Sequence, residues 1–155
     1  MTSASSSARR IAATVLAAGA VVGAAALPAA AQDRDHRPHP RVEISRVQAD
    51  SPGRDDRSNR SLNNEWVEIT NTTRDAVNLR GWTLRDADGN RYRFDNVRIN
   101  GRATIRIHTG TGHNTRTDLF QNRRDYVWDN RADTATLRDD RGRTVDTESW
   151  GRRHH

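Results

Sequence analysis

The 155-residue sequence contains no cysteine and no lysine, and aromatic residues make up only 5% of it. Without cysteine no disulfide can form, so a folded domain must be held together by the packing of its core alone. All 26 basic residues are arginine, and a coding bias toward GC-rich codons is the simplest explanation. Charged residues of both signs make up 30% of the chain, which indicates a mixed, solvated surface. This composition permits anionic partners without demanding them.

The N-terminal segment has the pattern of a signal peptide. Arg9 and Arg10 precede an apolar run over residues 11–27, and residues 29–31 are all alanine. We expect cleavage after Ala31, and therefore a secreted protein with no stable membrane insertion after cleavage. The alternative is that the apolar run stays in place as a membrane anchor. The pair Arg9 and Arg10 fits either the general or the twin-arginine export route. Cleavage would remove two arginines and no acid, so the formal net charge would fall from +6 to +4.

The rest of the chain has room for one domain with a single core. Residues 32–40 are charged and proline-containing, which indicates a flexible lead. Within it, His36 and His39 could bind a metal together, although two histidines in such a segment usually have no structural role. We expect the folded domain at residues 41–149 and a basic tail at residues 150–155.

Short segments with apolar residues two apart recur along the domain, separated by turn residues. They lie at residues 42–44, 65–69, 76–79, 82–84, 91–94, 104–109, 126–128 and 134–137, and around Val145. No segment has helical spacing over more than two turns. Eight or nine such strands predict an all-β sandwich or barrel. Two long connections, residues 49–64 and 110–125, are the kind of loop in which binding most often resides.

Several motifs occur in an order that resembles a known family. They read NEWVEI from Asn64, VNLRGWTLRDADGN from Val77, TIRIHTGTG from Thr104 and VWDNRADTATLRDD from Val127. Over residues 42–147 this order resembles the lamin tail domain family. The resemblance implies an immunoglobulin-like β-sandwich without known catalysis, which in nuclear lamins takes part in protein and DNA contacts. Bacterial members resemble exported proteins.

This chain departs from the nuclear lamins in three respects. It has a signal-peptide pattern, and it shows neither the heptad rod nor the prenylation box of those proteins. A nuclear or filament-forming role is therefore not expected, because fold carries over within a family further than function does.

The stretch DADGN at residues 86–90 begins like a calcium-binding loop. An EF-hand that started at Asp86 would need a glutamate eleven residues later, where the sequence has Val97. A hairpin fits better, with Asp88 and Gly89 as two left-handed turn positions between two strands. A second copy, TLRDDRG at residues 136–142, repeats the device.

Candidate catalytic groups are few. His108, His113 and Asp118 could approach one another, or use Asp125, as the metal site of a secreted hydrolase, but solvent-facing histidines are the simpler interpretation. No catalytic residue, cofactor or metal is therefore assigned.

Glu65 and Glu68 lie three apart on a predicted strand and so point to opposite faces. A pair of acids on opposite faces cannot act on one substrate. We expect structural roles for both: one should pair with an arginine across a strand, and the other should bind loop backbone.

Arginines supply the one candidate binding surface. Arg91 and Arg93 share the outward face of one predicted strand, and Arg102 and Arg106 share that of another. If these strands are neighbours, the four form an anion-binding stripe; otherwise they are solvated residues that discourage aggregation.

The four tryptophans divide into two pairs. Trp82 and Trp128 fit strand patterns and should lie in the core. Trp66 has the opposite parity to its apolar neighbours and Trp150 lies in the expected tail, so these two are the candidate surface aromatics.

Together these observations favour an exported, non-enzymatic interaction module of bacterial type. Its partner would be a protein or an anionic polymer, either a cell-wall polymer or a nucleic acid. A metal-assisted secreted hydrolase and a purely structural exoprotein are the alternatives.

Overall fold

The structure of the protein is a computed structural model, and it describes residues 41–151. This part of the chain contains one short helix and ten strands. In chain order the elements are β1 (Val42–Gln48), α1 (Asn59–Asn63), β2 (Trp66–Asn71), β3 (Val77–Asn78), β4 (Thr83–Arg85), β5 (Arg91–Arg93), β6 (Arg98–Ile99), β7 (Thr104–His108), β8 (Asp118–Phe120), β9 (Asp133–Arg138) and β10 (Thr144–Trp150). The expected signal peptide, the lead with its two histidines, and residues 152–155 lie outside the described residues.

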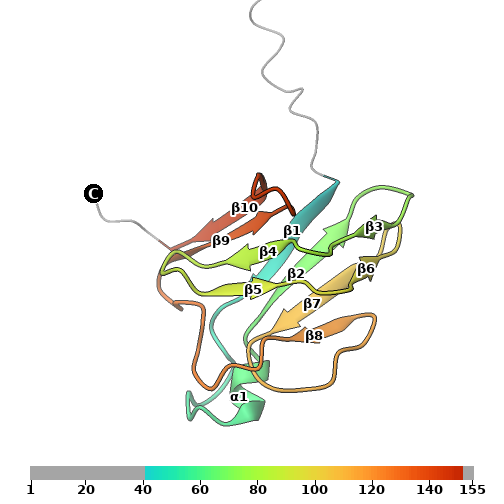
Figure 1. Ribbon diagram of the computed structural model, residues 1–155. Coiled ribbons are helices and arrows are strands. Elements are labelled where there is room, and N and C mark those ends of the chain that lie inside the picture. The colour runs from blue at the N-terminus through green and yellow to red at the C-terminus, as the bar shows by residue number, and fades with distance from the viewer. Residues whose placement is uncertain (1–40, 152–155) are drawn as a thin grey trace, which may run out of the picture. The chain divides into compact units, whose positions relative to one another are not determined.

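Eight of the strands form two four-stranded sheets, ordered β1-β2-β7-β8 and β10-β9-β4-β5 (Figure 1). The pair β3-β6 forms a small third sheet. Neighbouring strands run antiparallel, except that β7 and β8 run parallel. One apolar cluster unites buried residues of both large sheets. The all-β, immunoglobulin-like sandwich expected from the sequence is therefore confirmed.

The alternation of side chains in the sequence identified the inner and outer faces correctly. Val67 and Ile69 of β2 and Ile105 and Ile107 of β7 are at most 1% exposed. The residues between them are half-buried on the outer face. A strand buried on one face produces this period of two, because successive side chains point to opposite sides of a sheet.

Some elements differ from the sequence-based prediction. Residues 126–128 are not a strand, although Val127 and Trp128 are buried. Helix α1 lies in a connection that we expected to be a loop, and it begins where the Ser58 hydroxyl caps the backbone N–H of Ser61. Two short strands, β6 and β8, were not predicted, because two or three residues are too few to show a period.

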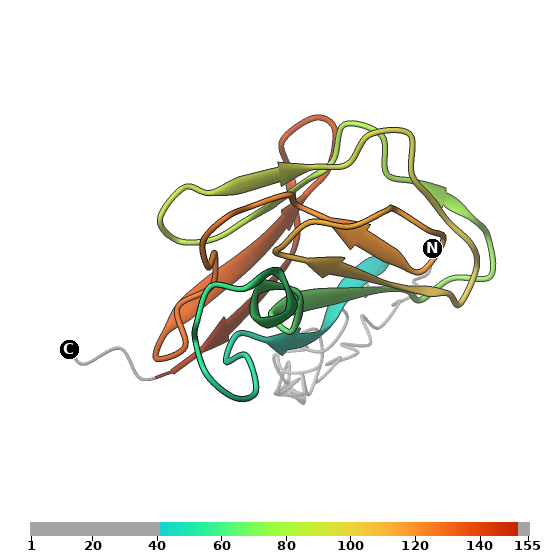
Figure 2. The same ribbon diagram turned by 90° about the horizontal axis from the view of Figure 1, so that it is seen from below.

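A side chain links the two large sheets at one edge. The Asp146 carboxylate of β10 accepts a hydrogen bond of 2.7 Å from the backbone N–H of Ile44 in β1. Strand pairing is irregular at both places, with register shifts around Ser45 and Val145. Helix α1 covers one end of the sandwich. It lies at the bottom of Figure 1, and it is seen end-on in Figure 2.

Candidate functional site

The four arginines predicted to form one stripe do not lie on neighbouring strands. Arg91 and Arg93 lie on β5, which pairs only with β4 among the described strands. Arg106 lies on β7, which belongs to the other large sheet. Arg102 precedes that strand in a turn, with φ of 62°. The predicted combination of these four arginines is therefore wrong.

Arg106 is engaged within its own sheet. Its Nε donates to Glu68 Oε2 at 3.0 Å, and its guanidinium carbon lies 4.2 Å from the centroid of the Trp66 ring. This ion pair across β2 and β7 is one of the two structural roles expected for the glutamates. Trp66 is half-buried beneath the guanidinium, and the Arg106 side chain remains 42% exposed.

A different set of arginines meets on the other large sheet. Arg85 of β4 pairs directly with Arg91 of β5, and Thr83 pairs with Arg93 on one side and with Arg138 of β9 on the other. The leucines between these positions point into the core. All four arginine side chains therefore project from the outer face, and we call Arg85, Arg91, Arg93 and Arg138 the arginine face. They line one hollow of about 300 Å³.

The arginine face has little internal charge compensation. Within residues 41–151, none of its four guanidinium groups lies within 4.0 Å of a carboxylate. Asp139 and Asp140 line the same hollow, but Asp139 is paired with Arg143 at 2.8 Å. Two further contacts involve backbone carbonyls. Arg138 donates weakly to Gly142, at 3.4 Å, and Arg123 donates to the carbonyl of Arg91 at 3.2 Å.

Arg138 Nε is a buried donor without a hydrogen-bond partner among residues 41–151. A buried donor without an acceptor is costly, so this atom lowers the stability of the fold.

The sequence contained a signal for the two arginines that our prediction missed. The triplet Thr-Leu-Arg occurs at residues 83–85 and again at 136–138, before each of the two similar turns. Each central leucine is buried, which places the flanking threonine and arginine outward. The copies are neighbours because β4 pairs with β9, and that pairing over a long sequence separation was not predicted.

The DADGN stretch forms the predicted hairpin between β4 and β5. Gly89 has φ of 98°, whereas Asp88 does not have a positive φ, so the turn has one left-handed position and not the two expected. Asp86 accepts hydrogen bonds from the backbone and the side chain of Asn90 through its two oxygens. The turn in the second copy, TLRDDRG, has the same two features: Gly142 has φ of 77°, and the Asp139 carboxylate accepts a hydrogen bond from the backbone N–H of Arg143. Both aspartates therefore stabilise their turns by accepting hydrogen bonds.

His108 and Asp118, two of the candidate catalytic residues, do come together. His108 Nε2 lies 2.9 Å from Asp118 Oδ1, and its Nδ1 lies 2.8 Å from the carbonyl oxygen of Asn63. Hydrogen bonds from Thr117 and His108 lower the pKa of Asp118. Both ring nitrogens are in contact with oxygen atoms of the protein, so neither points into open space where a metal ion could bind. His113 is exposed in its loop.

Metal-ligating residues do not cluster elsewhere in the described chain. Residues 41–151 contain no group of three or more His, Cys, Asp or Glu side chains able to hold a metal ion. The same residues contain no helix long and apolar enough to cross a membrane.

Glu65 performs the second structural role expected for the glutamates. Its Oε1 accepts hydrogen bonds from the Thr109 hydroxyl at 2.6 Å and from the backbone N–H groups of Val127 and Trp128 at 2.8 and 3.3 Å. Burial raises the pKa of Glu65 to about 7, against the opposing effect of these hydrogen bonds. Glu65 therefore anchors the irregular segment that we had predicted to be a strand.

Two tryptophans lie where the sequence predicted them, and Trp150 does not. Trp128 is buried in the core and Trp82 is half-buried against it, as expected. Trp150 is the last residue of β10 and not part of a tail. Its ring packs edge-to-face against Trp128 with centroids 5.8 Å apart, and its Nε1 donates to the carbonyl of Asp129 at 2.7 Å.

The domain has the fold and motif order of a known family. Residues 36–152 match the family model Lamin Tail Domain. No curated protein matches the chain. The family match spans most of the sequence and includes every described strand, and the chain therefore belongs to the lamin tail domain family.

Proposed function

We propose that the protein is an exported, non-enzymatic module that binds an anionic polymer across the arginine face. The observation that carries this proposal is the meeting of four outward arginines on one sheet, with no carboxylate of residues 41–151 within 4.0 Å of their guanidinium groups. Like charges placed directly opposite each other on a sheet are unfavourable, as for Arg85 and Arg91. A polyanion that bridges such positions converts this repulsion into attraction.

The spacing of the arginine face suits a repeating anion. Arg85 and Arg91 form one row across the strands, and Arg93 and Arg138 form the next row with Thr83 between them. Successive rows on one face lie about 6.6–6.8 Å apart, and neighbouring strands lie about 4.8 Å apart. Guanidinium groups bind carboxylates, sulfates and phosphates through paired N–H groups, so an array of this kind can follow a charged chain.

Salt dependence tests this binding directly. Protein comprising residues 32–155, the whole chain after the expected cleavage, is titrated by fluorescence with duplex DNA and with a teichoic-acid-type polymer at 50 and 200 mM salt. If four phosphates are neutralised, log affinity for duplex DNA should fall with log salt at a slope of about −3 to −4. Absent or salt-independent binding to both polymers would refute the proposal and leave a purely structural exoprotein.

Matched variants locate the site. Arg85→Gln/Arg91→Gln should weaken binding and flatten the salt slope by about two, one for each lost contact. Arg46→Gln/Arg60→Gln removes the same charge from exposed positions off the arginine face and should leave most of the slope unchanged. Equal losses in both pairs would show that net charge, and not the arginine face, controls binding.

Export has a separate test. The full chain with a C-terminal tag is expressed in a bacterial host, and the medium is analysed by N-terminal sequencing. We expect a mature product that begins at Gln32, and Ala29→Arg/Ala31→Arg should abolish that cleavage, because the site requires small residues. A full-length chain retained in the cell membrane would contradict cleavage.

A further inference from the structure

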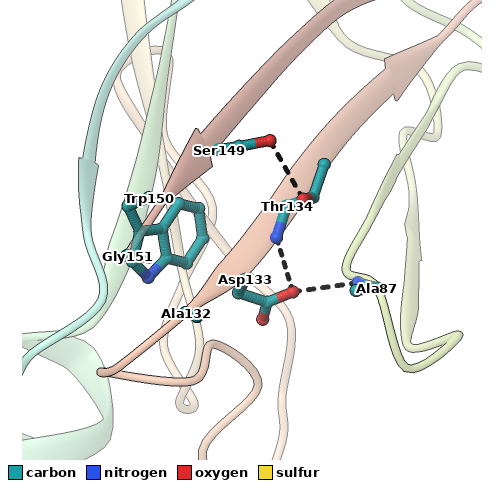
Figure 3. A pocket seen from close by; sticks show the side chains of 7 residues that line it. All are labelled: Ala87, Ala132, Asp133, Thr134, Ser149, Trp150 and Gly151. Atoms are coloured by element: carbon teal, nitrogen blue, oxygen red, sulfur yellow. Dashed lines mark hydrogen bonds between the residues drawn. The ribbon is translucent and has the colours of Figure 1, made fainter. Parts of the chain in front are cut away.

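A second feature of the same sheet bears on the class of polymer. At one end of β9 and β10 lies a pocket of about 520 Å³, lined among others by Trp150, Ser149, Thr134, Asp133 and Ala87 (Figure 3). Its size is in the range that holds a small organic group. Its lining combines an indole ring, two hydroxyl groups and a carboxylate, whereas four arginines dominate the hollow at the arginine face.

Hydrogen bonds hold the walls of this pocket in place. Asp133 Oδ1 accepts from the backbone N–H groups of Ala87 at 3.0 Å and Thr134 at 2.7 Å. The Thr134 and Ser149 hydroxyls lie 3.0 Å apart, and Figure 3 shows them side by side above Asp133. The bond from Trp150 Nε1 to the carbonyl of Asp129 fixes the orientation of the indole. A ligand would therefore meet a pocket that is already formed, which lowers the entropic cost of binding.

Gly151 closes the pocket by a close backbone approach. It has φ of 79°, and a Cβ at this position would lie 1.9 Å from the carbonyl oxygen of Arg131. Only glycine allows the end of β10 to lie against residues 131–132 in this way.

The pocket and the arginine face belong to one continuous surface. Thr134 precedes Thr136 by two residues on β9, and Thr136 pairs directly with Arg85. Both threonines therefore project from the same face of the sheet, about 6.6–6.8 Å apart along the strand. One polymer chain can consequently occupy the pocket and reach the arginines through its neighbouring units.

We infer that the polymer is an acidic glycan, with one sugar ring seated in the pocket and carboxylate, sulfate or phosphate groups on the arginine face. This inference rests on the proposed function. A sugar ring presents apolar C–H groups to an indole and hydroxyls around its edge, which the hydroxyls of Ser149 and Thr134 match as combined donors and acceptors. A nucleobase is held mainly by stacking over a whole aromatic face, whereas a sugar ring can be held by its hydroxyls with only a partial C–H contact to Trp150, which is half-buried and packs against Trp128.

Polymers of two kinds separate this inference from the proposed function. Residues 32–155 are titrated at one ionic strength with two acidic glycans, polygalacturonate and heparin, and with two non-glycan polyanions, linear polyphosphate and duplex DNA. We expect at least one glycan to bind more tightly than both non-glycan polymers. Equal or tighter binding of polyphosphate or DNA would overturn the inference and preserve the proposed function, and failure of all four polymers would overturn both.

Pocket variants give the second readout. Trp150→Phe and Ser149→Leu should weaken glycan binding by about three- to tenfold and leave polyphosphate binding unchanged. Thr111→Leu makes a matched change at an exposed loop position and should affect neither polymer. Ser149 is exposed, so its variant should fold even if the tryptophan variant does not. Equal losses for glycan and polyphosphate, or no loss in either pocket variant, would remove the pocket from the site.

Discussion

Arg85 lies directly opposite Arg91 across β4 and β5 on the outer face of the sheet. Neither guanidinium has a carboxylate within 4.0 Å in the described chain. Directly opposed like charges destabilise a sheet, so this pairing weakens the fold unless an anion binds. A residue pair that opposes stability is a reasonable place to look for function, because binding sites are where local rules of folding are most often broken.

The repulsion between Arg85 and Arg91 leads to a first prediction, about the free energy of unfolding. Arg91→Gln should increase the free energy of unfolding by about 0.2–1 kcal/mol at low salt, because it removes one of two opposed charges. Urea denaturation in 20 mM and 500 mM salt measures the effect, which should shrink at the higher concentration as the charges are screened. Arg74→Gln, at an exposed turn position, is the control. An equal gain in stability at both salt concentrations would argue against a charge effect.

Glu65 makes the second prediction. Its pKa is raised from the ordinary 4.5 to about 7 by burial, so the folded state holds a proton that the unfolded state has lost between these values. Stability should therefore fall as pH rises from about 4.5 to about 7, by up to about 3 kcal/mol. Other carboxylates oppose this trend, so the informative quantity is the difference between the wild type and Glu65→Gln.

Denaturation at pH 4.5, 6 and 8 provides that difference. The amide of Glu65→Gln stays neutral and keeps one oxygen acceptor for Thr109, Val127 and Trp128. Relative to the wild type, the variant should become more stable as pH increases, with the change confined to the window between about 4.5 and 7. A difference that does not vary with pH would mean that Glu65 is not protonated in this window.

The two turns make the third prediction. Gly89 and Gly142 both have left-handed φ, so Gly89→Ala and Gly142→Ala should each cost about 1–2 kcal/mol of stability. Neither position has a neighbour within 4 Å of an added Cβ, so the cost would come from the backbone alone. Thermal denaturation measures it, and the two losses should be additive because the turns are separate. A neutral substitution at either site would contradict the assigned conformation.

These turns illustrate what the sequence could predict. Local spacing identified the inner face of β2 and β7 and both hairpins, because each depends on residues close together in the chain. The composition of the arginine face was not predicted, because it depends on the pairing of β4 with β9, more than fifty residues away in sequence. Residues 126–128 were wrongly predicted to be a strand. Val127 and Trp128 are apolar because they are buried, and a buried loop needs apolar residues just as a strand does.

The same limit applies to the polar groups inside the fold. The pair Glu65 and Glu68 was correctly given structural roles from parity, since one side chain had to point inward and the other outward. The sequence did not identify their partners, because Thr109, Trp128 and Arg106 are brought to them by tertiary packing.

The link between the two sheets makes the last prediction. Asp146 Oδ2 accepts from the backbone N–H of Ile44 at 2.7 Å, where the pairing of β1 with β2 becomes irregular. Asp146→Ala should therefore cost about 1–3 kcal/mol, because it leaves a partly buried N–H without an acceptor. Asp146→Asn keeps an oxygen at this position and should lose less. Asp140→Ala, at an exposed site in the β9–β10 turn, should be nearly neutral.

Hydrogen exchange on the three variants distinguishes a local from a global effect. If Asp146 joins the sheets, the amide of Ile44 should exchange faster in Asp146→Ala than in Asp146→Asn, and the edges of β1 and β10 should lose protection together. Faster exchange spread evenly over all strands would instead mean that the variant only lowers global stability. Unchanged exchange at Ile44 would show that this hydrogen bond does not hold the sheets together, and the closure of the sandwich at this edge would then rest on the apolar core alone.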